Sequence, residues 1–130
     1  MKIKAFVERA NGQSYSCCAE KEVSKCLLVG YGKTAKEAID DFYVSFDELK
    51  KMDGDSVPDV EFELKFDVGS LFNYYSFLNI EGIARLSGIK PSVLRQYASG
   101  TRRPKEEKLK MLEDGLRKAS EQIQRVGLRA

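Results

Sequence analysis

The sequence predicts an α+β protein in which a small β-β-β-α-β domain, residues 1–67, is followed by an all-α domain, residues 68–130. Apolar residues recur at every second position in several segments of the first part, which also has one stretch with helical spacing, and with helical spacing throughout the second. The charges divide at the same place: 10 Lys and Arg face 14 Asp and Glu in the first part, a balance of −4, and 12 face 6 in the second, a balance of +6. This asymmetry indicates two modules with different partners, the basic one being a nucleic-acid candidate.

The first part opens with predicted strands. In residues 2–8 apolar side chains alternate with charged ones, as in a half-buried strand. Asn11-Gly12 follows, the pair that best tolerates the positive φ angles of a two-residue hairpin turn, so we expect a second strand over residues 14–19. The continuous apolar run Cys26–Tyr31 then predicts a central strand, because strands buried on both faces show no alternation.

A helix is expected after Thr34. Thr34 and Glu37 have capping-box spacing, in which the Thr34 hydroxyl accepts from the Glu37 N–H and the Glu37 side chain reaches back to Thr34. The helix should end near Gly54, and alternation in residues 60–66 predicts a fourth strand in a mostly antiparallel sheet. The apolar residues of the helix form one stripe: Ala35, Ala38, Ile39, Phe42, Phe46 and Leu49.

Composition argues against several classes of site. The chain has no His, which excludes Ser-His and Cys-His couples and imidazole metal ligands. Cys17, Cys18 and Cys26 form no C-x-x-C pair, so we expect reduced thiols rather than a zinc site or a disulfide framework, and no cofactor. The N-terminus is charged and no apolar run approaches about 18 residues. We therefore expect a soluble, cytoplasmic protein with no membrane partner.

Paired carboxylates offer one catalytic alternative. Asp40-Asp41 and Asp53/Asp55 are residue types that a metal-dependent nuclease needs. Adjacent residues on a helix point about 100° apart, however, so Asp40 and Asp41 do not converge by themselves. A solvated acidic face is the favoured interpretation, and no catalytic residue is predicted.

The second part predicts three successive short helices. One spans about residues 70–77, Asn79 caps a second over residues 80–87, and Gly88 supplies a turn. Pro91 suits the first turn of the third helix, which buries Val93, Leu94 and Tyr97 and ends before Ser99-Gly100. The spacing of large, small and glycine residues between positions 83 and 97 is what a steeply crossing helix pair requires.

A longer helix follows from Lys105 to about Val126. Its apolar residues are spaced alternately three and four apart, as in a coiled-coil seam, and Gly115 weakens this pattern. Dimerisation through the seam and packing against the domain core both explain such spacing. The seam consists of Leu109, Leu112, Leu116, Ala119, Ile123 and Val126.

The segment from Ile83 to Pro104, IARLSGIKPSVLRQYASGTRRP, resembles the lambda-repressor/Cro-like (XRE) helix-turn-helix family. Its ending, Ser99 to Pro104, is similar to that family's Ser-Gly-Lys-Arg-x-Pro closing turn. Lys90 stands where the family commonly has a capping Ser or Thr. The resemblance implies that helix 90–98 enters the major groove of double-stranded operator DNA.

The resemblance also implies residue roles. Ser92, Arg95 and Gln96 are the candidates for base edges, since Arg suits guanine and Gln suits adenine. The candidates for phosphate contacts are Lys90, Ser99, Thr101, Arg102 and Arg103. The window 85–110 carries eight cations against two anions, which favours DNA independently of the motif. A protein-interaction module with a solvated basic face is the alternative.

The order of the two modules, together with Gly32-x-Thr34-x-x-Glu37-Ala38, resembles the HicB antitoxin family. That resemblance implies a partial, degenerate ribonuclease H-like domain that binds a small HicA-like ribonuclease toxin, and an attached domain that represses the operon. The family's Pro-Asp-Leu-Pro-Gly stretch before the third strand is replaced here by Glu20–Lys25.

We therefore expect a HicB-like antitoxin and autorepressor, forming a homodimer or higher homo-oligomer and without catalytic activity of its own. One alternative is a solitary transcription regulator whose N-terminal module binds a ligand or another protein. Another is a small nuclease that uses Asp40, Asp41 and Asp53.

Overall fold

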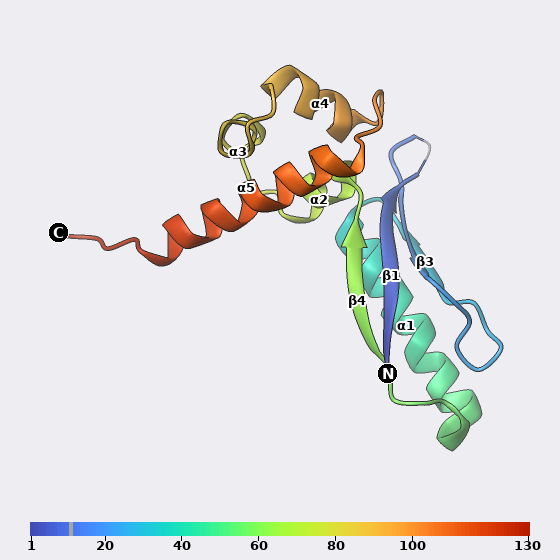
Figure 1. Ribbon diagram of the computed structural model, residues 1–130. Coiled ribbons are helices and arrows are strands. Elements are labelled where there is room, and N and C mark those ends of the chain that lie inside the picture. Colours follow the sequence, from blue (N-terminus) through green and yellow to red (C-terminus); the bar gives the residue numbers. More distant parts are fainter. Residues whose placement is uncertain (11) are drawn as a thin grey trace. The chain divides into compact units, whose positions relative to one another are not determined.

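The computed structural model describes residues 1–10 and 12–130, and their contacts divide the chain into two units, Met1–Tyr74 and Tyr75–Ala130 (Figure 1). The chain is α+β: the described residues form one four-stranded mixed sheet and five α-helices, with a short 3-10 turn at Gly54–Ser56. None of the described helices combines the length and the hydrophobicity needed to cross a membrane.

The sheet of the first unit has the strand order β3-β2-β1-β4. The β1–β2 and β2–β3 pairs are antiparallel, as predicted, whereas β1 and β4 run parallel, with Ala5 opposite Leu64. The parallel pair exists because helix α1 carries the chain from β3 back to the other side of β1. The strands are β1 Lys2–Arg9, β2 Tyr15–Ala19, β3 Val29–Gly32 and β4 Glu61–Phe66.

Helix α1, Ala35–Asp53, covers one face of this sheet (Figure 1). The predicted stripe of six apolar residues is buried, and the Thr34 hydroxyl accepts from the Glu37 N–H at 3.1 Å. The second half of the predicted capping box is wrong, because the Glu37 carboxylate accepts from the Lys33 N–H at 2.8 Å. Phe62 of β4 packs edge-on against the Phe42 ring, with centroids 4.8 Å apart.

The prediction of a central strand over Cys26–Tyr31 is wrong. Strand β3 begins only at Val29 and lies at the edge of the sheet, and β1 has neighbours on both sides. Leu27 and Tyr31 are 51% and 66% exposed, so the apolar run does not mark burial on both faces. Of the predicted Asn11-Gly12 turn, Asn11 lies outside the described residues, and Gly12 has a φ of +78°.

Helix α2, Val68–Tyr74, belongs to the first unit, whereas the sequence pattern predicts a helix at 70–77 in the second. The buried Ser70 hydroxyl donates to the Val7 carbonyl at 2.7 Å, and the Asn73 side-chain oxygen accepts from the Ala35 N–H at 2.8 Å. These bonds join α2 to β1 and to the start of α1. The division therefore falls at the end of α2, not after residue 67, and the charge balances are unchanged because α2 carries no charge.

The second unit contains α3 Ile80–Ser87, α4 Pro91–Ser99 and α5 Glu106–Gln124. These helices agree with the predicted ones, although α5 stops two residues before Val126. The buried apolar side chains of this unit are Ile83, Ala84, Ile89, Leu94, Tyr97 and Leu112.

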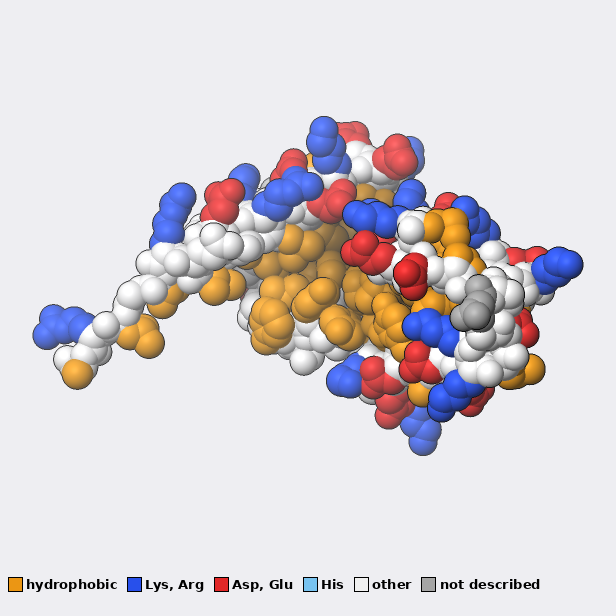
Figure 2. Space-filling view, turned by 90° about the horizontal axis from the view of Figure 1, so that it is seen from below, with side chains coloured by type: hydrophobic (Ala, Val, Ile, Leu, Met, Phe, Trp, Pro, Cys, Tyr) orange, Lys and Arg blue, Asp and Glu red, His pale blue; other side chains and the backbone are white. Residues whose placement is uncertain are grey.

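The two halves of α5 differ in their surroundings. Leu112 is buried in the unit, whereas Ile123 is 62% exposed and Val126, just beyond the helix, is 64% exposed. Figure 2 shows apolar side chains in view along the C-terminal part of α5, at the left. The predicted seam is thus partly a core contact and partly a surface feature.

Candidate nucleic-acid interface

The turn between α3 and α4 follows from local chemistry. The Asn79 side chain accepts from the Gly82 N–H at 2.8 Å and caps α3, as predicted. Gly88 ends α3 with a φ of +75°, a left-handed conformation that a residue without a Cβ adopts at little cost. Figure 1 shows α3 nearly end-on and α4 lying across the view, so the two helices cross steeply.

Helix α4 begins without a side-chain cap. Lys90 occupies the N-cap position in an extended conformation, and its side chain makes no capping hydrogen bond. Pro91 is the first helical residue, and because proline has no N–H, one of the unpaired donors of a helix start is absent. The Lys90 ammonium therefore remains exposed at this end of α4.

One face of α4 is open to solvent. Leu94 is fully buried and Tyr97 is 7% exposed, so they fix which side of the helix faces the core. The exposed residues recur at spacings of three, one and three, which places them on one helical face. These are Ser92, Arg95, Gln96 and Ser99, and they include all three predicted base-edge candidates.

The hydroxyl groups at the end of α4 close the helix. The Gln96 carbonyl accepts from the Ser99 hydroxyl at 3.1 Å, from the Thr101 hydroxyl at 3.3 Å and from the Thr101 N–H at 3.1 Å. The two hydroxyl oxygens are 3.0 Å apart. These contacts hold the Ser99–Thr101 turn in place, and the phosphate contacts predicted for both residues remain predictions.

Two of the candidate arginines have partners within the unit. The Arg95 guanidinium lies 3.3 Å from the Glu81 carboxylate of α3, and Arg102 donates a long hydrogen bond of 3.5 Å to the Gln96 side chain. Glu81 was not singled out from the sequence. The signal that could have found it is that Glu81 is the only acidic residue between positions 68 and 105.

All eight predicted DNA-binding residues are exposed. Hydrogen bonds join four of them, namely Gln96 with Ser99, Thr101 and Arg102, and Arg95 bonds separately to Glu81 of α3. In the part of the chain that the structure describes, the side chains of the other three make no hydrogen bond or ion pair with these five. Those three are Lys90, Ser92 and Arg103.

Two carboxylates of the nuclease alternative, Asp40 and Asp41, contact different partners. Asp40 pairs with Lys36 at 2.7 Å, and Asp41 accepts from the Tyr31 backbone N–H of the edge strand at 2.9 Å. Among the side chains that the structure describes, no three of Cys, Asp or Glu are grouped so that they could hold a metal ion. Asp41 thus has a structural contact at the sheet edge.

The cysteines differ in their surroundings. Cys17 is buried under α1, and this burial raises the pKa of its thiol to about 12, with a smaller contribution from the neighbouring Cys18. Cys18 is half-buried and Cys26 is exposed, and all three are free thiols. A thiol that stays protonated at neutral pH is a poor nucleophile.

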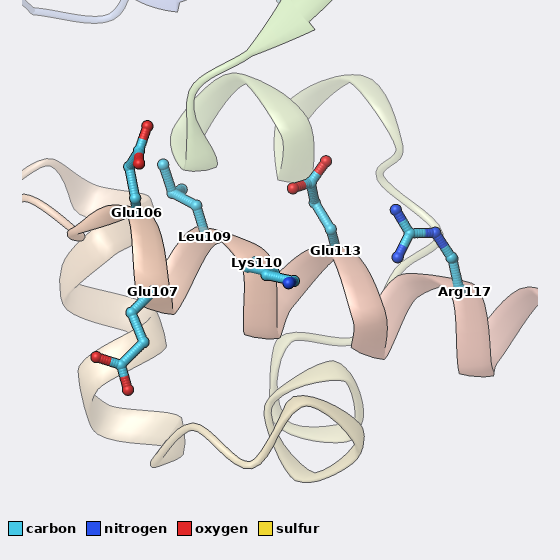
Figure 3. Close-up of a pocket in the computed structure, with 6 residues that line it drawn as sticks. All are labelled: Glu106, Glu107, Leu109, Lys110, Glu113 and Arg117. Carbon is cyan, nitrogen blue, oxygen red and sulfur yellow. The ribbon is translucent and has the colours of Figure 1, made fainter.

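A hollow on the surface of α5 has no features of a small-molecule site. Figure 3 shows its six lining side chains, which all come from α5 and spread to different sides of the helix. Three carboxylates, two cations and one leucine offer neither an apolar wall nor convergent polar groups. The lining residues are Glu106, Glu107, Leu109, Lys110, Glu113 and Arg117.

A scan against protein-family models and searches among curated proteins and solved structures found no match to this chain. The basis of the proposed function is therefore the residues of the chain, their geometry and the family resemblances of the sequence.

Proposed function

We propose that the chain is a HicB-like antitoxin of the cytoplasm, which represses its own operon through a helix-turn-helix and neutralises a HicA-like ribonuclease toxin. The observation that carries the DNA-binding part is the exposed face of α4, with Arg95 and Gln96 side by side within a strongly basic segment. In the proposed complex α4 lies in the major groove, Arg95 reads guanine and Gln96 reads adenine.

The cations around α4 supply the affinity that does not depend on sequence. Lys90, Arg102 and Arg103 are exposed, and they flank the two ends of the proposed recognition helix. Each phosphate contact releases counterions from the DNA, so binding weakens as salt rises. The Ser99 and Thr101 hydroxyls shape the turn that presents Arg102 and Arg103.

We propose that the first unit is the partial ribonuclease H-like domain and that it binds the toxin. Its element order and the single helix on one sheet face support this assignment. The solvent side of α1 carries the exposed carboxylates Asp40, Asp47 and Glu48 around Val44, which is 53% exposed. An acidic face complements a basic ribonuclease and mainly raises the association rate.

A homodimer or higher homo-oligomer is part of the proposal, because two copies read two half-sites of an operator. The exposed end of the α5 seam, Ile123 and Val126, supports it, since these side chains lie beyond the part of α5 that packs on its own unit. Sedimentation of Ile123→Asp against the unchanged chain tests this contact. A monomeric variant supports it, and an unchanged oligomer places the interface elsewhere.

The DNA-binding part is tested by mobility shift with the duplex upstream of the chain's own gene. Arg95→Ala with Gln96→Ala should remove the sequence preference, because each lost base contact costs about 1–3 kcal/mol. Arg103→Ala should weaken binding to all sequences and reduce the salt slope by about 0.9. Lys118→Ala on α5 is the matched control outside the basic segment. If the double variant keeps its preference, α4 is not the reading helix.

A solitary transcription regulator is the second candidate, and one observation favours it. The segment that replaces the family's Pro-Asp-Leu-Pro-Gly stretch is a tight turn in which Ser24 and Lys25 have positive φ values of 50° and 65°. A short backbone bridge between Val23 and Cys26 closes this turn. Purification from the native cell separates the two candidates. A small basic ribonuclease that co-purifies supports the antitoxin, and a chain that purifies with DNA but without a protein partner supports the solitary regulator.

A further inference from the structure

Glu81 and Arg95 form the single described ion pair that connects two different elements of the structure. Glu81 is the second residue of α3, Arg95 lies in the middle of α4, and their nearest charged atoms are 3.3 Å apart. The other ion pairs among the described residues lie within α1, within β4 and within α5. This pair therefore spans the turn that presents the exposed face of α4.

The helix dipole favours an acid in the first turn of α3, but the ion pair of Glu81 with Arg95 adds little to stability. The two side chains are 53% and 60% exposed, and exposed ion pairs contribute little to folding. Orientation is a different matter, because a free arginine side chain samples many rotamers, whereas its planar guanidinium must be aligned to bond a guanine edge with two N–H groups. A carboxylate on a neighbouring helix restricts where that guanidinium lies before DNA arrives.

The charge of Glu81 has a second effect. It is the only acid between residues 68 and 105, in a region whose other charges favour phosphate, so it opposes the approach of any duplex. At a cognate site the guanidinium gains two base acceptors that offset this repulsion. At a wrong site it gains none. The charge of Glu81 lowers affinity for every duplex, and discrimination between sequences comes from the orientation of Arg95, which only a cognate site uses.

We propose that Glu81 is a positioning and specificity-determining residue, which holds Arg95 for base reading and lowers affinity for non-cognate DNA. This inference rests on the proposed function, because it requires that the α3–α4 pair binds duplex DNA. Glu81 lies outside the eight residues that the sequence predicts to bind DNA.

The experiment measures two dissociation constants for the full chain. One probe is the duplex that the unchanged chain selects from a randomised library, and the other is a scrambled duplex of the same composition. Glu81→Gln keeps a hydrogen-bond acceptor but removes the charge, so binding to the scrambled probe should tighten about three- to tenfold, while binding to the selected probe changes less. Glu81→Ala also loses the orientation of Arg95, so the specificity ratio should fall further.

Two controls separate this effect from general charge and from misfolding. Glu121→Gln on α5 makes the same change of charge at an exposed position of the same unit, and it should leave the specificity ratio unchanged. In a chain that already carries Arg95→Ala, adding Glu81→Ala should leave the specificity ratio unchanged, because no arginine remains to be oriented. If Glu81→Ala lowers the melting temperature, Glu81→Gln alone decides the result.

The outcomes are distinguishable. If the unchanged chain selects a duplex and Glu81→Gln leaves the ratio as it was, the role of Glu81 is overturned and the proposed DNA binding stands. A library from which the unchanged chain enriches no sequence overturns the proposed function, and the role of Glu81 with it. A fall in the ratio that is equal for Glu81→Gln and Glu121→Gln reduces the effect to net charge and also overturns the inference.

Discussion

The α-carbon of Gly115 on α5 lies directly against Ser87 at the end of α3. A Cβ at position 115 would lie only 2.9 Å from the Ser87 α-carbon and closer still to its hydroxyl oxygen. Gly115 is itself buried. The glycine that weakens the helical seam in the sequence is therefore what allows α3 and α5 to approach at backbone distance.

Gly115→Ala should destabilise the second unit even though alanine is the better helix former. The added methyl group meets the Ser87 side chain and its α-carbon, which is held by the backbone and cannot yield as a flexible side chain would, and overpacking of this kind costs about 1–3 kcal/mol. Urea unfolding followed by circular dichroism measures the change. Gly127→Ala is the control, because its Cβ would meet nothing within 4 Å. If Gly115→Ala is as stable as the control, the close contact with Ser87 does not exist.

Ser87→Ala should be neutral or stabilising. The Ser87 hydroxyl is buried and has no hydrogen-bond partner in the part of the chain that the structure describes, so its removal relieves an unpaired polar group. The free energy of unfolding should stay within about 0.5 kcal/mol of the unchanged chain or rise. A clear loss of stability would mean that the hydroxyl has a partner in solution.

Ser70→Ala should destabilise the first unit by about 0.5–1.5 kcal/mol, because the buried Val7 carbonyl loses its 2.7 Å donor and keeps only the Asp67 N–H at 3.1 Å. Ser120→Ala, at an exposed position of α5, is the matched control and should have little effect. Amide hydrogen exchange of β1 and α2 identifies which unit is affected. Loss of protection confined to the second unit would contradict the assignment of α2 to the first.

Asp41→Ala should cost more stability than Asp40→Ala. Asp41 accepts the Tyr31 N–H of the edge strand, whereas Asp40 forms an exposed i,i+4 pair with Lys36 that contributes little to stability. Thermal unfolding of both variants compares them directly. Magnesium-dependent RNA cleavage that Asp40→Asn abolishes would instead restore the nuclease alternative.

The stability of the first unit should depend on Cys17 in alkaline solution. Burial raises the pKa of this thiol from 9.0 to about 12, so the unfolded chain loses its proton first. The contribution of the protonated Cys17 thiol to the free energy of unfolding is therefore complete below pH 9, and it is lost as the pH rises from 9 towards 12. Urea unfolding between pH 8 and pH 11 measures this loss. The free energy of unfolding of Cys17→Ala should change less with pH over the same range. Parallel curves would show that the thiol is not buried in solution.

Local pattern was sufficient to predict most of the elements. The period-two segments became β1, β2 and β4, and the six-residue stripe of α1 is buried as expected. The position of β3 could not be read from its apolar run, because Leu27 and Tyr31 are apolar but exposed. The assignment of α2 failed for a related reason: its bonds to Val7 and Ala35 join residues far apart in the sequence, which no local pattern encodes.

The candidate interface was predictable to a similar degree. Helical spacing and turn chemistry placed the exposed face of α4 correctly, since both depend on neighbouring residues. The contact between Glu81 and Arg95 was not predicted, because it depends on how α3 and α4 cross rather than on their separate patterns. The same limit applies to Gly115 and Ser87.

The assignment of α2 to the first unit leaves the second with a small interior. Among the described residues, fifteen buried apolar side chains lie in the first unit and six in the second. Since small interiors give marginal stability, we expect the second unit to melt first on heating. In the proposed antitoxin, warming would then relieve repression while neutralisation persists, so that heat stress would increase synthesis of both proteins before any toxin is released.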